Sequence, residues 1–143
     1  RWKPKPHIKA YQKLKRKLKA ITKRNWSISL DNRIKQINYL VRGWVNYFRI
    51  ANMKNAIEEI DKHLRTQIRV IIWKQWKKPQ RKEKALKQLG VKPDIAYNLA
   101  YTGKGYQLVA KTDWLKFAIN NDSLRKRGLI FLSDQYEKVH VEI

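Results

Sequence analysis

Apolar and polar residues alternate with the period of an α-helix over residues 30–51. The apolar positions recur at steps of three and four residues, which predicts one buried helix face. That face contains Ile34, Ile37, Val41, Trp44 and Phe48. A second series with the same steps lies on the opposite side and contains Lys35, Tyr39, Arg42, Asn46 and Arg49. Because a merely solvated face usually mixes both signs of charge, this acid-free series predicts contact with a polyanion.

The preceding residues predict another amphipathic helix, over residues 7–24, after an extended lead-in at residues 1–6. Its apolar face contains Ile8, Tyr11, Leu14, Leu18 and Ile21. The remaining surface carries cations but no glutamate for i,i+4 pairing. These cations are Lys9, Lys13, Arg16, Lys17, Lys23 and Arg24. A solubilising exterior is the alternative, but we favour polyanion contact, since phosphate contacts supply affinity that does not depend on sequence.

A third helix is predicted after a break at residues 52–55. Its apolar face contains Ile57, Ile60, Leu64, Ile68 and Ile71. Its last turn carries Lys74, Lys77 and Lys78, which suit the negative end of the helix dipole, and we also predict that they contact nucleic acid. Trp73 lies on the far side of this helix. We expect later segments to cover it, with stacking on a nucleic acid or a partner domain as the alternative.

The remainder of the chain predicts short helices without repeats. Gly90 is expected to end one helix and Pro93 to open the next. Residues 102–105 predict a turn, residues 106–109 are extended or irregular, and Thr112 is predicted to cap a further helix. The tail from residue 136 is ambiguous. The predicted fold is therefore all-α, with a three-helix module at residues 1–78 and a smaller helical extension packed on it at residues 79–143.

Gly43 stands inside the second predicted helix, where glycine costs about 1 kcal/mol relative to alanine. Such a glycine usually allows another backbone to approach closely. Either the first helix packs there or a sugar-phosphate backbone does, and the sequence leaves both open. Trp44 and Phe48 are predicted to be core residues. Ser29 is predicted to be the N-cap of the same helix, with Asp31 in its first turn.

The charge balance supports a polyanionic partner. Lysine and arginine number 34 against 11 acids, a formal net charge of +23 in 143 residues. A folded chain with this imbalance repels itself unless a partner supplies countercharge. Nucleic acid is the first candidate and an anionic membrane surface the second. The chain has no cysteine, and no apolar run approaches the roughly 20 residues of a membrane span.

No catalytic, metal or cofactor site is predicted. The three histidines are scattered, and Glu59 with His63 is interpreted as a surface pair rather than a metal motif. Two-metal polymerases and nucleases need clustered carboxylates about 4 Å apart around their ions. The adjacent acids Glu58 and Glu59 point to different sides of one helix. The chain is therefore predicted to be a binding module and not an enzyme.

Several motifs resemble one known family. They include the basic helix at residues 3–24, the block Arg42-Gly-Trp-Val-Asn-Tyr-Phe48 and the block Ile72-Trp-Lys-Gln-Trp-Lys-Lys78. Leu89-Gly90 and Thr102-Gly-Lys-Gly-Tyr106 follow in the expected order. With these motifs, nearly the whole chain resembles the maturase-specific (X or thumb) domain of group II intron-encoded reverse transcriptases.

The resemblance implies a function and partners. A thumb of this family grips the RNA/DNA template–primer duplex and anchors the protein to its own intron RNA, promoting splicing and retrohoming. The resemblance also implies a parent polymerase with fingers and palm, whose catalytic Tyr-x-Asp-Asp box is not in this sequence. Since the chain begins at Arg1, we expect it to be part of that longer protein, in the bacterial cytoplasm and without a membrane partner.

One departure and several alternatives remain. Where many relatives have cations or aromatics after Tyr106, this chain has Gln107 and Leu108, which weakens any prediction that residues 102–108 contact nucleic acid. A stand-alone structural RNA-binding protein without a polymerase is the main alternative, and a membrane-surface protein ranks last. The sharpest hypothesis is that Arg42, Asn46 and Arg49 touch nucleic acid directly, Asn46 through a 2′-hydroxyl or groove edge, with Tyr39 stacking.

Overall fold

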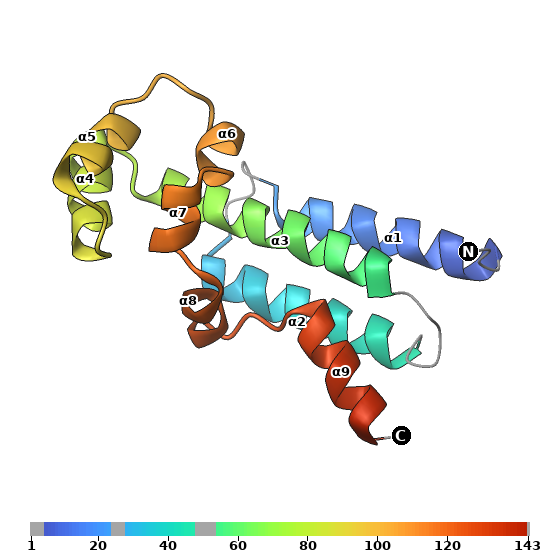
Figure 1. Cartoon of the computed structure of the whole chain (residues 1–143). Helices are drawn as coiled ribbons and strands as arrows, with labels where there is room; N and C mark the ends of the chain where they lie inside the picture. Colours follow the sequence, from blue (N-terminus) through green and yellow to red (C-terminus); the bar gives the residue numbers. More distant parts are fainter. Residues whose placement is uncertain (1–4, 24–27, 48–53, 143) are drawn as a thin grey trace. The chain divides into compact units, whose positions relative to one another are not determined.

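The computed structural model describes residues 5–23, 28–47 and 54–142 (Figure 1). These residues form nine helices and no strand, which confirms the all-α prediction. Contacts divide the chain into two compact units. The first comprises residues 1–64 and 125–143, and the second comprises residues 65–124. Each unit has its own buried core.

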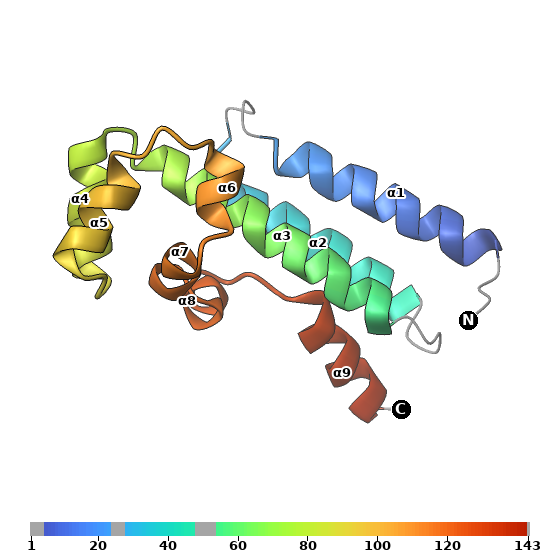
Figure 2. The same ribbon diagram turned by 45° about the horizontal axis from the view of Figure 1, so that its top comes forward.

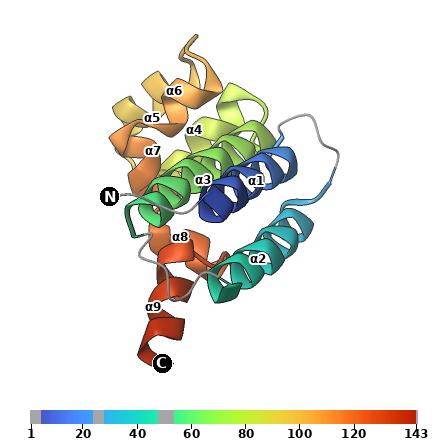
Figure 3. The same ribbon diagram turned by 90° about the vertical axis from the view of Figure 1, so that its right-hand side faces the viewer.

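The first unit is built from three long helices and the last helix of the chain. They are α1 (Lys5–Ile21), α2 (Leu30–Tyr47), the half of α3 (Lys54–Gln75) that ends at Leu64, and α9 (Leu132–Glu142). Helices α1 and α2 are in contact, and α9 packs on α2. Figures 1 and 3 show α1, α2 and this half of α3 running along one another, with α2 opposite in direction to α1.

The core of the first unit follows the predicted apolar stripes. Ile37, Val41 and Val45 of α2 are completely buried. The predicted apolar positions that the structure describes on α1 and on this half of α3 are buried as well, apart from the half-buried Tyr11; the buried ones are Leu14, Leu18, Ile21, Ile57, Ile60 and Leu64. Since burying one such side chain contributes about 1.5–3 kcal/mol, these stripes dominate the stability of the module.

Two polar side chains, on α2 and α3, bind the C-terminal segment of the first unit. The Asp61 carboxylate of α3 is 2% exposed and accepts hydrogen bonds from the backbone N–H groups of Leu132 and Ser133, at 2.7 and 2.8 Å. It therefore caps the N-terminus of α9, where the helix dipole favours negative charge. The Asn38 amide of α2 donates to the Gly128 carbonyl and accepts from the Ile130 N–H, at 2.7 and 2.8 Å.

The second unit consists of the rest of α3 and five short helices. These are α4 (Pro79–Gln88), α5 (Pro93–Ala100), α6 (Tyr106–Ala110), α7 (Asp113–Ala118) and most of α8 (Asn121–Lys126). Helices α4 and α5 form a helical hairpin (Figure 2), and α6 contacts α7. Proline begins α4 and α5, where its missing N–H costs nothing. Gly90 follows α4 with a φ of +96°, a conformation that favours glycine.

Trp73 is buried within the second unit, as predicted, at 2% exposure. The Nζ atom of Lys82 from α4 lies 4.7 Å from the centroid of the Trp73 ring and 5.3 Å from that of Tyr106. Burial lowers the pKa of Lys82, and the two aromatic faces compensate part of the lost hydration of the ammonium group. Lys82 of α4 thus lies against aromatic rings of both α3 and α6.

Arg69 makes a second buried connection in this unit. Its Nε donates to the Ile119 carbonyl at 2.7 Å and its Nη2 to the Asn121 side chain at 3.1 Å. Burial, followed by repulsion from Arg65, lowers the pKa of Arg69 to about 10. The guanidinium therefore keeps its charge at neutral pH. This contact attaches the segment between α7 and α8 to α3.

Some local predictions were wrong. Lys5 and Pro6 belong to α1 rather than to an extended lead-in, and Lys54 and Asn55 belong to α3 rather than to a break. Residues 106–110 form the helix α6, and residues 136–142, which the sequence left ambiguous, belong to α9. The caps at Ser29 and Thr112 are confirmed, since their hydroxyls accept hydrogen bonds from the N–H groups of Asn32 and Leu115.

Candidate nucleic-acid interface

A buried arginine sets the junction between α1 and α2. The Arg33 side chain, 3% exposed, donates from Nη1 to the carbonyls of Ile21 and Lys23, at 2.9 and 2.6 Å. Its Nε donates to the Ile28 carbonyl at 3.3 Å. Burial lowers the pKa of Arg33. Because the last carbonyls of a helix have no partner within it, Arg33 satisfies the end of α1 and ties that end to the start of α2.

Beyond this junction, α1 and α2 enclose a groove of about 570 Å³. Its lining from α1 is Ala10, Lys13, Leu14 and Lys17. Its lining from α2 is Tyr39, Leu40, Arg42, Gly43 and Trp44. We call this surface the α1–α2 groove. It combines an apolar floor with three cations and contains no acid.

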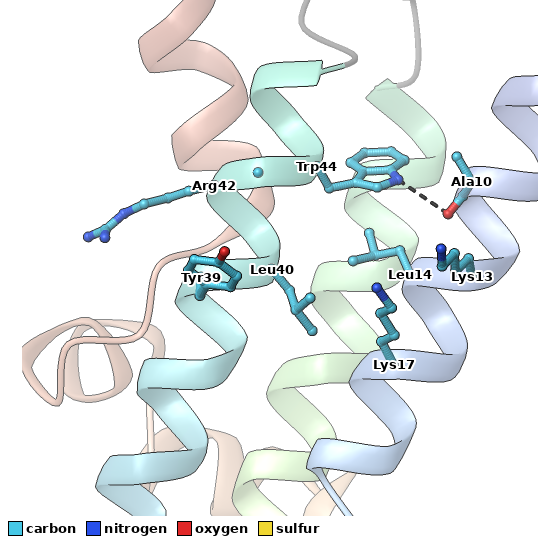
Figure 4. A pocket seen from close by; sticks show the side chains of 9 residues that line it. Ala10, Lys13, Leu14, Lys17, Tyr39, Leu40, Arg42 and Trp44 are labelled. Carbon is cyan, nitrogen blue, oxygen red and sulfur yellow. Dashed lines mark hydrogen bonds between the residues drawn. The ribbon is translucent and has the colours of Figure 1, made fainter.

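The side chains of the groove have distinct directions (Figure 4). Leu14 extends from α1 toward α2, and Leu40 extends from α2 toward α1. The Trp44 indole reaches across to α1, where its Nε1–H donates to the Ala10 carbonyl at 3.3 Å (Figure 4). Arg42 instead extends away from α1 (Figure 4). The cations that face the groove therefore come from α1, whereas Arg42 belongs to the outer surface of α2.

The structure exposes every predicted contact residue that it describes on α1 and α2. On α1 and just after it these are Lys9, Lys13, Arg16, Lys17 and Lys23; on α2 they are Lys35, Tyr39, Arg42, Gly43 and Asn46. Tyr39 is 80% exposed, which leaves its ring accessible for stacking. Arg24, Arg49 and Phe48 lie outside the described residues. The structure thus brings Lys13, Lys17, Tyr39 and Gly43 together on one groove, whereas the side chain of Arg42 is directed away from α1.

The three remaining predicted residues lie in the second unit. Lys74, Lys77 and Lys78 are exposed at and just after the end of α3. Lys77 has a φ of +50°, a left-handed conformation that is unusual for a residue with a Cβ. Its N–H bonds to the Lys74 carbonyl at 3.0 Å, which closes the end of α3. These lysines therefore belong to the second unit and not to the lining of the α1–α2 groove.

Sequence reasoning missed part of the groove and misplaced one residue. Trp44 was predicted to be core, but it is only half-buried and lines the groove. Ala10 and Leu40 were not predicted to take part, although both are half-buried and belong to the floor. Leu40 falls between the apolar and polar stripes of α2. A large apolar residue at such a boundary position is the signal that could have indicated a groove wall.

Gly43 is open rather than packed against α1. Within the described structure, no atom outside its own helical surroundings lies within 4 Å of the position that a Cβ would occupy. Gly43 is also exposed and belongs to the groove lining. Of the two explanations that the sequence left open, close packing of the first helix is therefore not what this structure contains. The space above Gly43 is available to a ligand.

Gly43→Ala is expected to stabilise the protein while weakening nucleic-acid binding. The new methyl group meets free space, and alanine at an exposed helix-interior position is favoured over glycine by about 0.5–1 kcal/mol. The same methyl group occupies space that a sugar-phosphate backbone would use. Chemical denaturation measures the first effect and a binding titration the second. A stabilised variant with unchanged affinity for nucleic acid would show that Gly43 is not part of the interface.

No helix in the described part of the chain combines the length and apolar character needed to cross a membrane. In the same part, no three His, Cys, Asp or Glu residues form a group able to hold a metal ion. Residues 11–90 match the family model of the group II intron, maturase-specific domain. A comparison with curated proteins found no match. The matched region includes the lining of the α1–α2 groove apart from Ala10, and it continues through α4 to Gly90.

Proposed function

The chain belongs to the group II intron, maturase-specific domain family, and from this premise we propose that its α1–α2 surface binds the structured RNA of a group II intron. Membership gives the chain a role as a maturase domain, which is itself non-catalytic. The proposal adds the surface through which the domain acts. It also assigns Arg42 and Asn46, on the exposed face of α2, to direct RNA contact.

The observation that carries this proposal is the composition of the groove and its rim. Lys13 and Lys17 face a space that also contains an 80% exposed tyrosine, and no acid lines it. Structured RNA is recognised mainly through phosphates, 2′-hydroxyls and shape. Lysines at one-turn spacing on α1 suit consecutive phosphates, while the amide of Asn46 suits a 2′-hydroxyl. The +23 net charge favours rapid, salt-dependent association with such a polyanion.

The proposal extends to the parent protein. In it, residues 1–78 act as a thumb that grips template–primer duplex, and residues 79–143 act as its extension. The fingers and palm of a bacterial, cytoplasmic reverse transcriptase are the partners within the same chain, and splicing and retrohoming are the processes served. The alternative is a stand-alone RNA-binding protein. Reading the upstream coding sequence for a Tyr-x-Asp-Asp palm decides between them.

The test compares two double variants with equal charge. Lys13→Ala/Lys17→Ala removes the cations that face the groove, whereas Lys15→Ala/Lys19→Ala removes two other exposed cations from α1. If Lys13 and Lys17 each contact one phosphate, the first variant lowers affinity and reduces the slope of log affinity against log salt by about 2, or about 1 per lysine. The control variant retains most of the slope.

The binding titration uses structured group II intron RNA over a salt series, with an unrelated structured RNA of equal length beside it. Preference for intron RNA, lost in the Lys13/Lys17 variant, supports a specific anchor. Equal losses in the two double variants would show that only the total charge matters, and would contradict a defined site on the α1–α2 surface.

A further inference from the structure

The apolar floor of the α1–α2 groove is not explained by phosphate binding. Phosphates and riboses are strongly hydrated, so they gain nothing from the half-buried Ala10, Leu40 and Trp44 or from the buried Leu14. A ligand that benefits from this floor must present a flat or compact apolar surface. A regular RNA helix presents none, because the flat faces of its bases are stacked inside and its surface consists of sugar, phosphate and polar base edges.

We propose that the α1–α2 groove receives one unpaired nucleobase of the bound RNA, such as a bulged or looped-out base, while Lys13 and Lys17 hold the adjoining phosphates. The proposal rests on the proposed function, since it names the part of the RNA that this surface recognises. It turns the groove from a general cation site into a site that selects unpaired nucleotides.

The volume of the groove and its opening to solvent are compatible with an unpaired nucleobase. The groove volume of about 570 Å³ lies within the range of about 300–1,000 Å³ in which proteins bind small organic ligands. Tyr39 and Gly43 are exposed at its mouth. Among the described residues, no atom outside the chain neighbours and the helix backbone of Gly43 lies within 4 Å of the position that its Cβ would occupy. A base can therefore enter from solvent without displacing an element of the fold.

The surrounding groups supply the interactions that a nucleobase needs. Aromatic side chains stack on bases, and the exposed Tyr39 ring is free to lie against one face of the base. The Trp44 indole uses its N–H on the Ala10 carbonyl, so it closes the groove with apolar surface rather than with a donor. The lining has cations and no acid, which favours a nucleotide over an uncharged or cationic ligand.

The experiment compares two RNA hairpins that differ by a single unpaired 2-aminopurine in the middle of the stem. Wild-type protein is expected to bind the bulged hairpin about tenfold more tightly than the fully paired one. The fluorescence of the 2-aminopurine is expected to change on binding as the base leaves the stem and meets Tyr39. Both measurements use the full chain at one fixed salt concentration.

Two variants test the groove directly. Ala10→Leu fills the floor without a change of charge, and Tyr39→Ala removes the stacking ring from a position that is 80% exposed. Each is expected to abolish the preference for the bulged hairpin, so that the ratio of affinities for the bulged and the paired hairpin falls from about ten to about one. Ala20→Leu places the same larger side chain at an exposed position of α1 outside the groove lining, and it should behave like the wild type. Circular dichroism verifies that each variant is folded.

The outcomes separate this inference from the proposed function. If the wild type binds both hairpins equally, or if folded Ala10→Leu keeps the preference, the base site is overturned while RNA binding stands. If the wild type binds neither hairpin, the base site is overturned, whereas the proposed function is decided by the titration against group II intron RNA. Loss of the preference in Ala10→Leu and Tyr39→Ala, but not in Ala20→Leu, establishes the base site.

Discussion

Asp61→Ala is expected to lower the free energy of unfolding by about 3 kcal/mol, an unusually large effect for the loss of one carboxylate. The two Asp61 oxygens accept the N–H groups of Leu132 and Ser133. Leu132 is completely buried, so water cannot replace the lost acceptor there. The substitution also removes a negative charge from the positive end of α9.

The measurement is urea denaturation followed by circular dichroism, together with hydrogen exchange of α9. Asp134→Ala provides a matched control, because Asp134 supplies a second carboxylate at the first turn of α9, and its ion pair with Arg125 is solvent-exposed. Exposed pairs contribute about 0–1 kcal/mol. If Asp61→Ala and Asp134→Ala have equal costs, the buried cap does not hold α9 in place.

Arg33→Ala is expected to destabilise the protein by a similar amount, about 3 kcal/mol. Three carbonyls, those of Ile21, Lys23 and Ile28, lose the donor that satisfies them. The end of α1 would then need water to enter the junction with α2. Since this junction holds the two walls of the groove together, affinity for RNA is expected to fall with stability.

Arg42→Ala on the same helix is the control, because Arg42 is exposed and a surface substitution usually changes stability by less than about 0.5 kcal/mol. Thermal and urea denaturation of both variants provide the comparison. Arg33→Lys should be nearly as destabilised as Arg33→Ala, because one ammonium group cannot reproduce the spread of guanidinium donors. A fully stable Arg33→Lys protein would contradict the bridging role.

The long helices of this protein were largely predictable because their apolar residues recur with the helical period over many residues. The stripes of the first three helices contain residues that the structure buries, such as Ile37, Leu14 and Ile60. Helix α6 has only five residues, too few for a period to distinguish a helix from an irregular segment. Its Gln107 is held by paired amide hydrogen bonds with Gln67 at 3.0 and 3.1 Å, a contact that local sequence does not reveal.

The candidate site was predictable as a set of faces but not as a groove. Helical spacing assigns Lys13 and Lys17 to the exposed surface of one helix and Tyr39 and Gly43 to that of another. Whether these surfaces meet depends on the rotation of each helix about its axis. That rotation is set by core packing and by Arg33, whose guanidinium donates to carbonyls 10 and 12 positions earlier in the sequence.

The sequence by itself determined the helical periods, the acid-free cationic faces and the membership of a family, because these are properties of residue order and type. Tertiary structure alone decided that α1 and α2 enclose a groove with an apolar floor, that Trp44 lines it, and that Asp61 caps a helix 71 residues away. The physical reason is that periodicity specifies which side of a helix is apolar, whereas packing specifies which partner covers it and which part stays open.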